Sequence, residues 1–276
     1  MSYLFPKIFR SESGPSEPSI PPGYRVYAVG DVHGRADLVD ELLERIEVDR
    51  AGRGPAKTVL VFLGDLIDRG PASAEVIERL RTYAPNRARL VFLMGNHEEV
   101  LLRLLRGESE YLRDWLRFGG AECAKSYGLE PSALKRLAPE RAVQVLRDKI
   151  PASHRRFLES FVDTFRLGGY LFVHAGIRPG VQLAEQSQTD LRWIRDPFLE
   201  DQCDHGFVVV HGHTIAEEIQ VRNNRIGLDT GAYHSGVLTA LGLDRDQRWF
   251  LQTIAPSSGF ESPESGPRLV ASEKLG

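Results

Sequence analysis

This chain of 276 residues has few cysteines, a small net charge and no long apolar run. Its two cysteines, Cys123 and Cys203, lie far apart, which excludes a cysteine-ligated metal site and indicates a reducing compartment. We expect both to be small buried side chains. The formal net charge is −3 and the sequence has no basic stripe, so nucleic acid is not an expected partner.

Apolar runs reach only about six to eight residues, well below the roughly 20 that cross a membrane. Residues 1–10 lack the continuous apolar stretch of a signal peptide, so we expect a cytoplasmic protein with no membrane partner. Residues 11–22 and 256–276 are rich in Ser, Pro and Glu, a composition that buries little apolar surface. The sequence therefore predicts a flexible arm at 1–22, one folded domain at 23–255 and a flexible tail at 256–276.

The first half of this domain alternates strands with helices. Buried strands are predicted at 24–29, 58–63 and 89–94, and apolar residues at helical spacing follow the first two. This alternation predicts a parallel sheet covered by helices on both faces.

Residues 98–163 show helical patterns broken by glycine and proline, which predicts a helical insertion able to cap the domain. Its apolar stripe, which includes Leu101 and Leu105, is expected to be core. Strands then return in a more antiparallel arrangement, with a hairpin turn at Asn223-Asn224. The later strands are expected at 170–173, 207–210, 219–221, 225–228, 237–243 and 248–254.

Polar residues gather where the predicted strands end. In open α/β sheets, ligands bind at the carboxyl ends of the strands, so these side chains are expected to meet in one crevice. Carboxylate, imidazole and amide oxygen suit Mn²⁺, Fe or Zn²⁺ better than copper or an iron–sulfur cluster. The segments are Gly30-Asp31-Val32-His33-Gly34, Gly64-Asp65-Leu66-Ile67-Asp68-Arg69-Gly70, Gly95-Asn96-His97-Glu98, His174-Ala175-Gly176 and His211-Gly212-His213-Thr214.

These five segments resemble the signature of the phosphoprotein-phosphatase family of calcineurin-like metallophosphoesterases, and within it the bacterial branch typified by the phage lambda phosphatase. The resemblance covers about residues 24–254. It implies an α/β fold in which a central mixed β-sandwich is flanked by helices and carries a helical insertion. It also implies a centre of two divalent ions, with Mn²⁺ preferred and Fe or Zn²⁺ as alternatives.

The resemblance also implies which residues hold the ions, and a water or hydroxide between the ions would be the nucleophile. The implied metal ligands are Asp31 and His33 for the first ion, Asp65 as a bridge, and Asn96, His174 and His213 for the second.

Further roles implied by the resemblance concern proton transfer and phosphate binding. His97 would protonate the leaving oxygen and Asp68 would orient it, although a plain ion pair between Asp68 and Arg69 is the alternative. Arg69 would bind phosphate oxygens through a forked contact. Arg195 resembles a second phosphate-binding arginine, but Arg192 is an equally available neighbour.

One position departs from the family pattern. Typical members that act on phosphoproteins have an arginine directly before the GNHE segment, where this chain has Met94. The related diadenosine tetraphosphate hydrolases commonly have an apolar residue there. They also usually carry Gln in place of His33 and Asp in place of Glu98, so the residues favour neither substrate class outright.

The remaining polar residues are expected to play supporting parts. We expect His211 and Asp229 to support the metal ligands rather than bind metal. For His234 a structural role is favoured over a substrate role. His154 and His205 lie outside every motif and are expected to be solvated.

Three functions follow from these observations. The favoured one is hydrolysis of phosphomonoesters, with Ser/Thr phosphoproteins as substrates, motivated by the complete motif set. The second is hydrolysis of a dinucleoside polyphosphate or another nucleotide, motivated by Met94. The third is a non-catalytic metal-binding scaffold, against which the intact His97 and Asp68 argue. The expected partner is thus a phosphoprotein or a small phosphorylated substrate.

Overall fold

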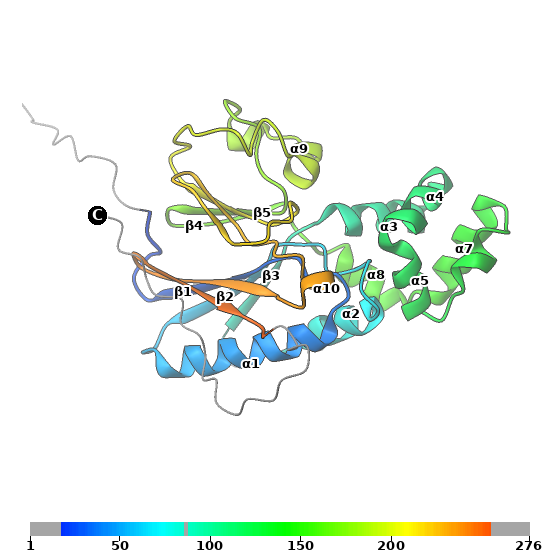
Figure 1. Ribbon diagram of the computed structural model, residues 1–276, viewed down its shortest axis with the longest axis horizontal. Helices are drawn as coiled ribbons and strands as arrows, with labels where there is room; N and C mark the ends of the chain where they lie inside the picture. Colours follow the sequence, from blue (N-terminus) through cyan, green and yellow to red (C-terminus); the bar gives the residue numbers. More distant parts are fainter. Residues whose placement is uncertain (1–17, 86–87, 255–276) are drawn as a thin grey trace, which may run out of the picture.

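The computed structural model describes residues 18–85 and 88–254, which form two facing β-sheets with helices outside them (Figure 1). The first sheet has the strand order β10-β9-β1-β2-β3. β1, β2 and β3 are parallel, and β9 runs antiparallel to both β1 and β10. Its strands are β1 (Tyr24–Val29), β2 (Lys57–Phe62), β3 (Ala88–Phe92), β9 (Thr239–Asp244) and β10 (Gln247–Gln252).

The second sheet has the order β4-β5-β6-β8-β7, with parallel pairs in its centre and antiparallel pairs at its edges. The turn between β7 and β8 falls at Asn223-Asn224, as predicted. β4 was not predicted from the sequence. The strands are β4 (Thr164–Leu167), β5 (Tyr170–Val173), β6 (Val208–His211), β7 (Gln220–Val221) and β8 (Arg225–Gly227).

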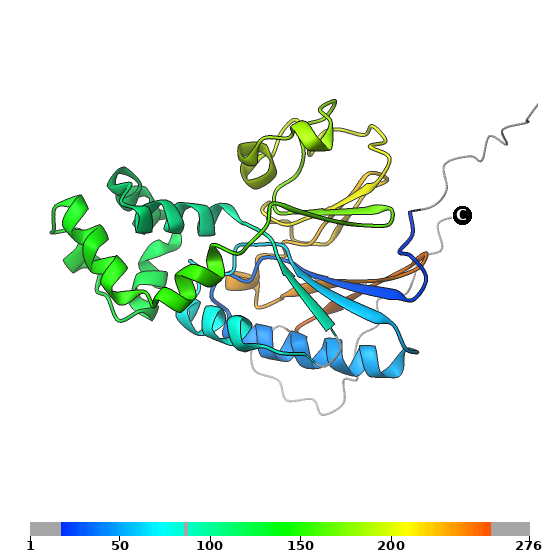
Figure 2. The ribbon, with the colours of Figure 1, turned by 180° about the vertical axis from the view of Figure 1, so that it is seen from behind.

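The two sheets bury apolar side chains against each other. Val26 and Val61 from the first sheet and Phe172 and Val210 from the second belong to this shared core. Each such fully buried side chain stabilises the fold by roughly 1.5–3 kcal/mol. Helices α1 (Ala36–Gly52) and α2 (Ser73–Thr82) cover the outer face of the first sheet, and α9 (Gln188–Trp193) lies beyond the second (Figure 2). The predicted mixed β-sandwich flanked by helices is therefore confirmed.

The helical insertion lies at one end of the sandwich, beside the carboxyl ends of β1, β2 and β3 (Figures 1 and 2). The chain leaves the first sheet after β3 and returns beside it, where Met94 N–H donates to Val162 O at 2.9 Å. No helix within the described residues is long and apolar enough to cross a membrane. The insertion contains α3 (Asn96–Arg106), η1 (Ser109–Tyr111), α4 (Leu112–Trp115), η2 (Leu116–Gly120), α5 (Ala121–Ser126), α6 (Pro131–Leu134), α7 (Pro139–Lys149) and α8 (Ala152–Leu158).

Some expectations for single residues were wrong. Ile20 lies within the predicted arm 1–22, yet it is buried and its N–H donates to Arg245 O at 2.8 Å. His154 is buried rather than solvated, because it bridges Tyr127 and Glu78 between the insertion and α2. Residues 1–17 and 256–276 of the predicted arm and tail lie outside the described residues.

Two further expectations failed in the loop before β6. Cys203 is exposed, whereas Cys123 is buried as expected. His205 is half-buried rather than solvated, and its Nε2 lies 3.3 Å from Asp201. Short polar-rich loops carry no periodicity from which burial could be inferred.

Candidate metal centre

The loops that follow five strands bring the six predicted metal ligands together at one end of the sandwich. Asp31 and His33 follow β1, Asp65 follows β2, and Asn96 begins α3 directly after β3. The other two follow β5 and β6. All six side chains are buried: Asp31, His33, Asp65, Asn96, His174 and His213.

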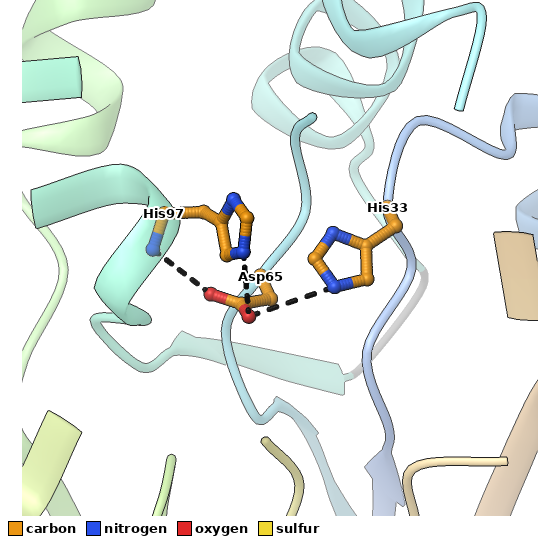
Figure 3. Close-up of side chains that lie close together, drawn as sticks. All are labelled: His33, Asp65 and His97. Atoms are coloured by element: carbon orange, nitrogen blue, oxygen red, sulfur yellow. Dashed lines mark hydrogen bonds and ion pairs between the residues drawn. The ribbon is translucent and has the colours of Figure 1, made fainter. Parts of the chain in front are cut away.

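His33, Asp65 and His97 form the first cluster, with the two imidazoles on either side of the carboxylate (Figure 3). His33 Nδ1 lies 2.8 Å from Ile67 O, and a carbonyl oxygen only accepts, so Nδ1 carries the proton. The lone pair of Nε2 then faces Asp65 Oδ2 at 3.6 Å without a hydrogen-bond partner. Burial lowers the pKa of His33 to about 3, which keeps this lone pair free to bind a cation.

Asp65, His174 and His213 form the second cluster. His174 Nδ1 donates to Leu63 O at 2.8 Å, so its Nε2 lone pair points at Asn96 Oδ1, 3.0 Å away, and at Asp65 Oδ1, 3.5 Å away. His213 Nδ1 approaches the same Asn96 oxygen at 2.9 Å. Burial lowers the pKa of His174 and lowers that of His213 to about 3, which favours neutral imidazoles that could bind a cation.

Asp31 completes the arrangement from the β1 loop. Its Oδ2 accepts the backbone N–H of His213 at 3.0 Å, but its buried Oδ1 has no hydrogen-bond partner. Burial and the carboxylates of Asp229 and Asp65 raise the pKa of Asp31 well above its usual range. A Cβ at position 212 would overlap Oδ1 of Asp31, so only glycine fits there. Unpartnered buried oxygen and nitrogen atoms of this kind fit divalent cations, which would satisfy them.

Asp65 occupies the middle of both clusters. Burial by itself would raise the pKa of its carboxyl, but His174, His97 and His33 outweigh burial and lower it. Glu98 fixes the Asp65 loop, because its carboxylate accepts the backbone N–H groups of Asp65, Leu66 and Gly95 at 2.8–3.1 Å. Sequence reasoning gave Glu98 no role, because Gly95 before α3 has no side chain and the Ser/Thr-x-x-Glu sign of a capping box is missing.

The backbone at the site is strained. Of the non-glycine residues described, those with positive φ angles are almost all candidate site residues, and a positive φ costs such a residue of order 1–3 kcal/mol. The exception is Arg245 in the β9–β10 turn. The site residues concerned are His33, Asp65, Asp68, Arg69 and His213, with φ between 45° and 69°.

His97 and Asp68 form a buried pair beside the first cluster. Nδ1 of His97 lies 2.7 Å from Asp68 Oδ2, while its Nε2 faces Asp65 Oδ2 at 3.8 Å. Burial opposes protonation of His97, but the carboxylates of Asp65 and Asp68 outweigh it and raise the pKa of His97 to about 9. The Asp68 carboxylate thus holds the imidazole at Nδ1 and favours its protonated form, as a proton donor requires.

The three arginines near the site differ in whether an acidic side chain already binds them. Arg192 is held by Asp163 at 2.6 Å and by Glu99 at 3.4 Å, so it is not an equal alternative to Arg195. Arg195 is exposed and has no ion-pair partner among residues 18–85 and 88–254. Arg69 lies on the loop between the first cluster and the insertion, with its guanidinium 5.1 Å from the ring of Tyr233.

Two other histidines lie outside both clusters, as does the carboxylate of Asp229. His211 is buried beside Gly212 and burial lowers its pKa to about 4. His234 is exposed and packs edge-on against Tyr233. Asp229 accepts the backbone N–H of Gly231 at 3.0 Å, which shapes the turn into α10 (Ala232–Ser235).

A model of the calcineurin-like phosphoesterases matches residues 24–236, a span that contains every residue of both clusters. The chain belongs to the calcineurin-like phosphoesterase family. As a metallophosphoesterase it is a metal-dependent hydrolase, and its His/Asp clusters fit divalent ions. The resemblance seen in the sequence is thus confirmed for the family as a whole, and the phosphoprotein-phosphatase branch stays a prediction.

Similar proteins include two curated bacterial enzymes and a solved structure. A symmetrical bis(5'-nucleosyl)-tetraphosphatase of Xanthomonas campestris pv. campestris is 27% identical over 88% of this chain and 86% of its own. An asymmetrical one of Halalkalibacterium halodurans is 28% identical over 77% of this chain and 87% of its own. A crystal structure provisionally assigned as a diadenosine tetraphosphatase shares the fold, with a TM-score of 0.60 at 19% identity over 83% of this chain and 94% of that chain.

Proposed function

We propose that this phosphoesterase hydrolyses dinucleoside polyphosphates, a class represented by diadenosine tetraphosphate. The observation that carries the proposal is the position of Met94. Its side chain is buried in the core beside the insertion, so the site has no cation where phosphoprotein-cleaving relatives are expected to have one. The similarity to bis(5'-nucleosyl)-tetraphosphatases over most of the chain supports the same substrate class.

We propose further that the six predicted ligands hold two divalent ions, Mn²⁺ by preference. When bound, they supply an activated water and positive charge that stabilises the phosphoryl transition state. Asp65 lies between the clusters and suits the bridging position. The remaining ligands proposed are Asp31 and His33 for the first ion, and Asn96, His174 and His213 for the second.

The other site residues act on the substrate. His97 gives a proton to the leaving phosphate oxygen from Nε2, while its Nδ1 is held by Asp68. Arg69 and Arg195 approach from different loops and bind non-bridging oxygens along the polyphosphate. This division leaves Arg192 to join α9 to Glu99 of α3 and to Asp163, which directly precedes β4.

A second candidate is the function first favoured by the sequence, hydrolysis of phosphomonoesters on Ser or Thr. The His97–Asp68 pair supports it, because an alkoxide is a poor leaving group that needs a proton donor more than a nucleoside diphosphate does. The same pair argues against a non-catalytic scaffold, in which a buried acid and its partner would have no use.

The experiment compares substrates on metal-stripped protein to which Mn²⁺ is returned. Diadenosine tetraphosphate, a phosphoserine peptide and a phosphotyrosine peptide are offered at equal concentration, with Asp65→Asn as the inactive control. We expect the highest kcat/KM for the dinucleotide. Faster turnover of either peptide would overturn the proposal in favour of the second candidate. The products of the dinucleotide, ADP alone or ATP with AMP, identify the phosphoanhydride bond that breaks.

A further inference from the structure

The insertion supplies a hydrogen bond to the carboxylate that holds His97. Nε1 of Trp115, at the end of α4, donates to Asp68 at 3.1 Å from Oδ2 and 3.2 Å from Oδ1. His97 Nδ1 lies 2.7 Å from the same Oδ2. Asp68 is 0% exposed and Trp115 3%, so water does not compete for these bonds. The carboxylate therefore joins an indole of the insertion to the proposed proton donor.

Two glycines of η2 set the position of the indole. A Cβ on Gly120 would overlap the ring of Trp115, so a larger residue there would push the indole away from Asp68. Gly119 has φ +120 and its carbonyl accepts the N–H of Arg69 at 3.0 Å. A Cβ on Gly119 would lie 2.6 Å from Cγ of Arg69. The bend in η2 thus holds the Trp115 indole against Asp68 and the Gly119 carbonyl against Arg69.

We propose that Trp115 is a positioning residue for the hydrolytic reaction. Its N–H fixes the Asp68 carboxylate in the orientation that receives His97, and it does so as a neutral donor that leaves the charge of the pair unchanged. The insertion is then part of the machinery for leaving-group protonation. This inference rests on the proposed role of His97 in the preceding section.

Trp115→Phe removes the N–H and keeps most of the ring. Trp249 provides a matched control, because it is also buried and its Nε1 donates to Asp49 at 3.0 Å, on the β10 edge away from the site. We expect Trp115→Phe to lower kcat by about ten- to a hundredfold, the factor for one hydrogen bond to a charged group, with KM unchanged. Trp249→Phe is expected to keep both constants. Equal kcat for the two variants would overturn the proposal.

A double substitution separates positioning from general loss of structure. Because Trp115 acts through Asp68 and His97, Trp115→Phe should cost nothing further in a His97→Asn background. A further loss of the same size in that background would show that Trp115 acts by another route and would overturn the proposal.

A measurement without catalysis keeps the inference independent of the substrate. The chain has three tryptophans, so its indole N–H signals are readily resolved by NMR. Asp68→Asn should shift the Trp115 signal and speed its solvent exchange, while the Trp249 signal stays in place. An unchanged Trp115 signal would overturn the contact itself. If the wild-type protein hydrolyses none of the substrates, the proposed function fails, and this signal still tests the contact.

Discussion

Nε2 of His174 lies 3.0 Å from Oδ1 of Asn96, although each atom presents a lone pair to the other. The proton of His174 is committed to Leu63 O through Nδ1, and burial lowers the pKa of the ring, so protonation does not relieve the repulsion. Asp65 Oδ1 adds a third lone pair at 3.5 Å. A cation held by His174, Asn96 and Asp65 would turn this repulsion into coordination, which is the physical basis for the proposed metal centre.

Metal binding is expected to stabilise the fold. Mn²⁺ at about a hundredfold excess over its Kd would add about 2.7 kcal/mol and raise the Tm by roughly 5–10 °C, since it neutralises buried carboxylates that are unpaired without it. Differential scanning fluorimetry with and without EDTA measures the change. Asp65→Asn should lose most of the gain, and an equal gain in that variant would place the binding elsewhere.

His97→Asn is expected to lower kcat by roughly 10²–10⁴ through loss of the proton donor. Bound metal, counted in the same samples, should not change. His234→Asn is the matched control, because that imidazole is exposed and should be dispensable for rate. If bound metal falls together with the rate, His97 is a metal ligand instead. Bound metal is counted because His97 lies in one cluster with His33 and Asp65.

Arg195→Ala is expected to reduce kcat/KM for diadenosine tetraphosphate by about ten- to a hundredfold, since a charge-assisted bond to phosphate is lost. Arg192→Ala removes a neighbouring arginine that is bound to Asp163 and Glu99, so it should alter stability rather than rate. Steady-state kinetics of both variants show which of the two arginines binds phosphate. A larger kinetic effect from Arg192→Ala would reverse the assignment.

Glu98→Gln should destabilise the protein by about 1–3 kcal/mol. Both carboxylate oxygens of Glu98 accept backbone N–H groups, and in glutamine one of these oxygens becomes an NH₂ group that cannot accept. Urea unfolding in EDTA measures the loss without interference from metal. Glu140→Gln, at an exposed position of α7, should stay within about 0.5 kcal/mol of the wild type. A Glu98→Gln protein of wild-type stability would contradict the bracing role given to this carboxylate.

The sequence predicted well where these side chains lie, because each candidate ligand directly follows a strand. Gly30-Asp31, Gly64-Asp65 and Gly95-Asn96 mark the ends of parallel strands, and parallel strands end at one edge of a sheet. The position of a ligand in space therefore followed from its position along the chain. The positions of these residues do not identify the ions or the substrate, because several divalent ions share the same ligand types.

The contacts of the insertion could not be predicted from the sequence. Trp115 belongs to an apolar helical pattern that is indistinguishable from ordinary core, and its contact with Asp68 spans 47 positions of sequence. His154 carries no motif, so its bridge to Glu78 depended on how α8 packs against α2. β4 was missed because it is short and half-exposed, with no clear alternation. Tertiary contacts of these kinds leave no local pattern.

The most direct test of the metal-dependent account is the rate of diadenosine tetraphosphate hydrolysis as Mn²⁺ is titrated into metal-stripped protein, with bound metal counted in the same samples. The account predicts no turnover without metal and a rate that reaches its maximum as the second ion binds to each chain. Full activity in the stripped protein, or a maximum reached with a single bound ion, would contradict it.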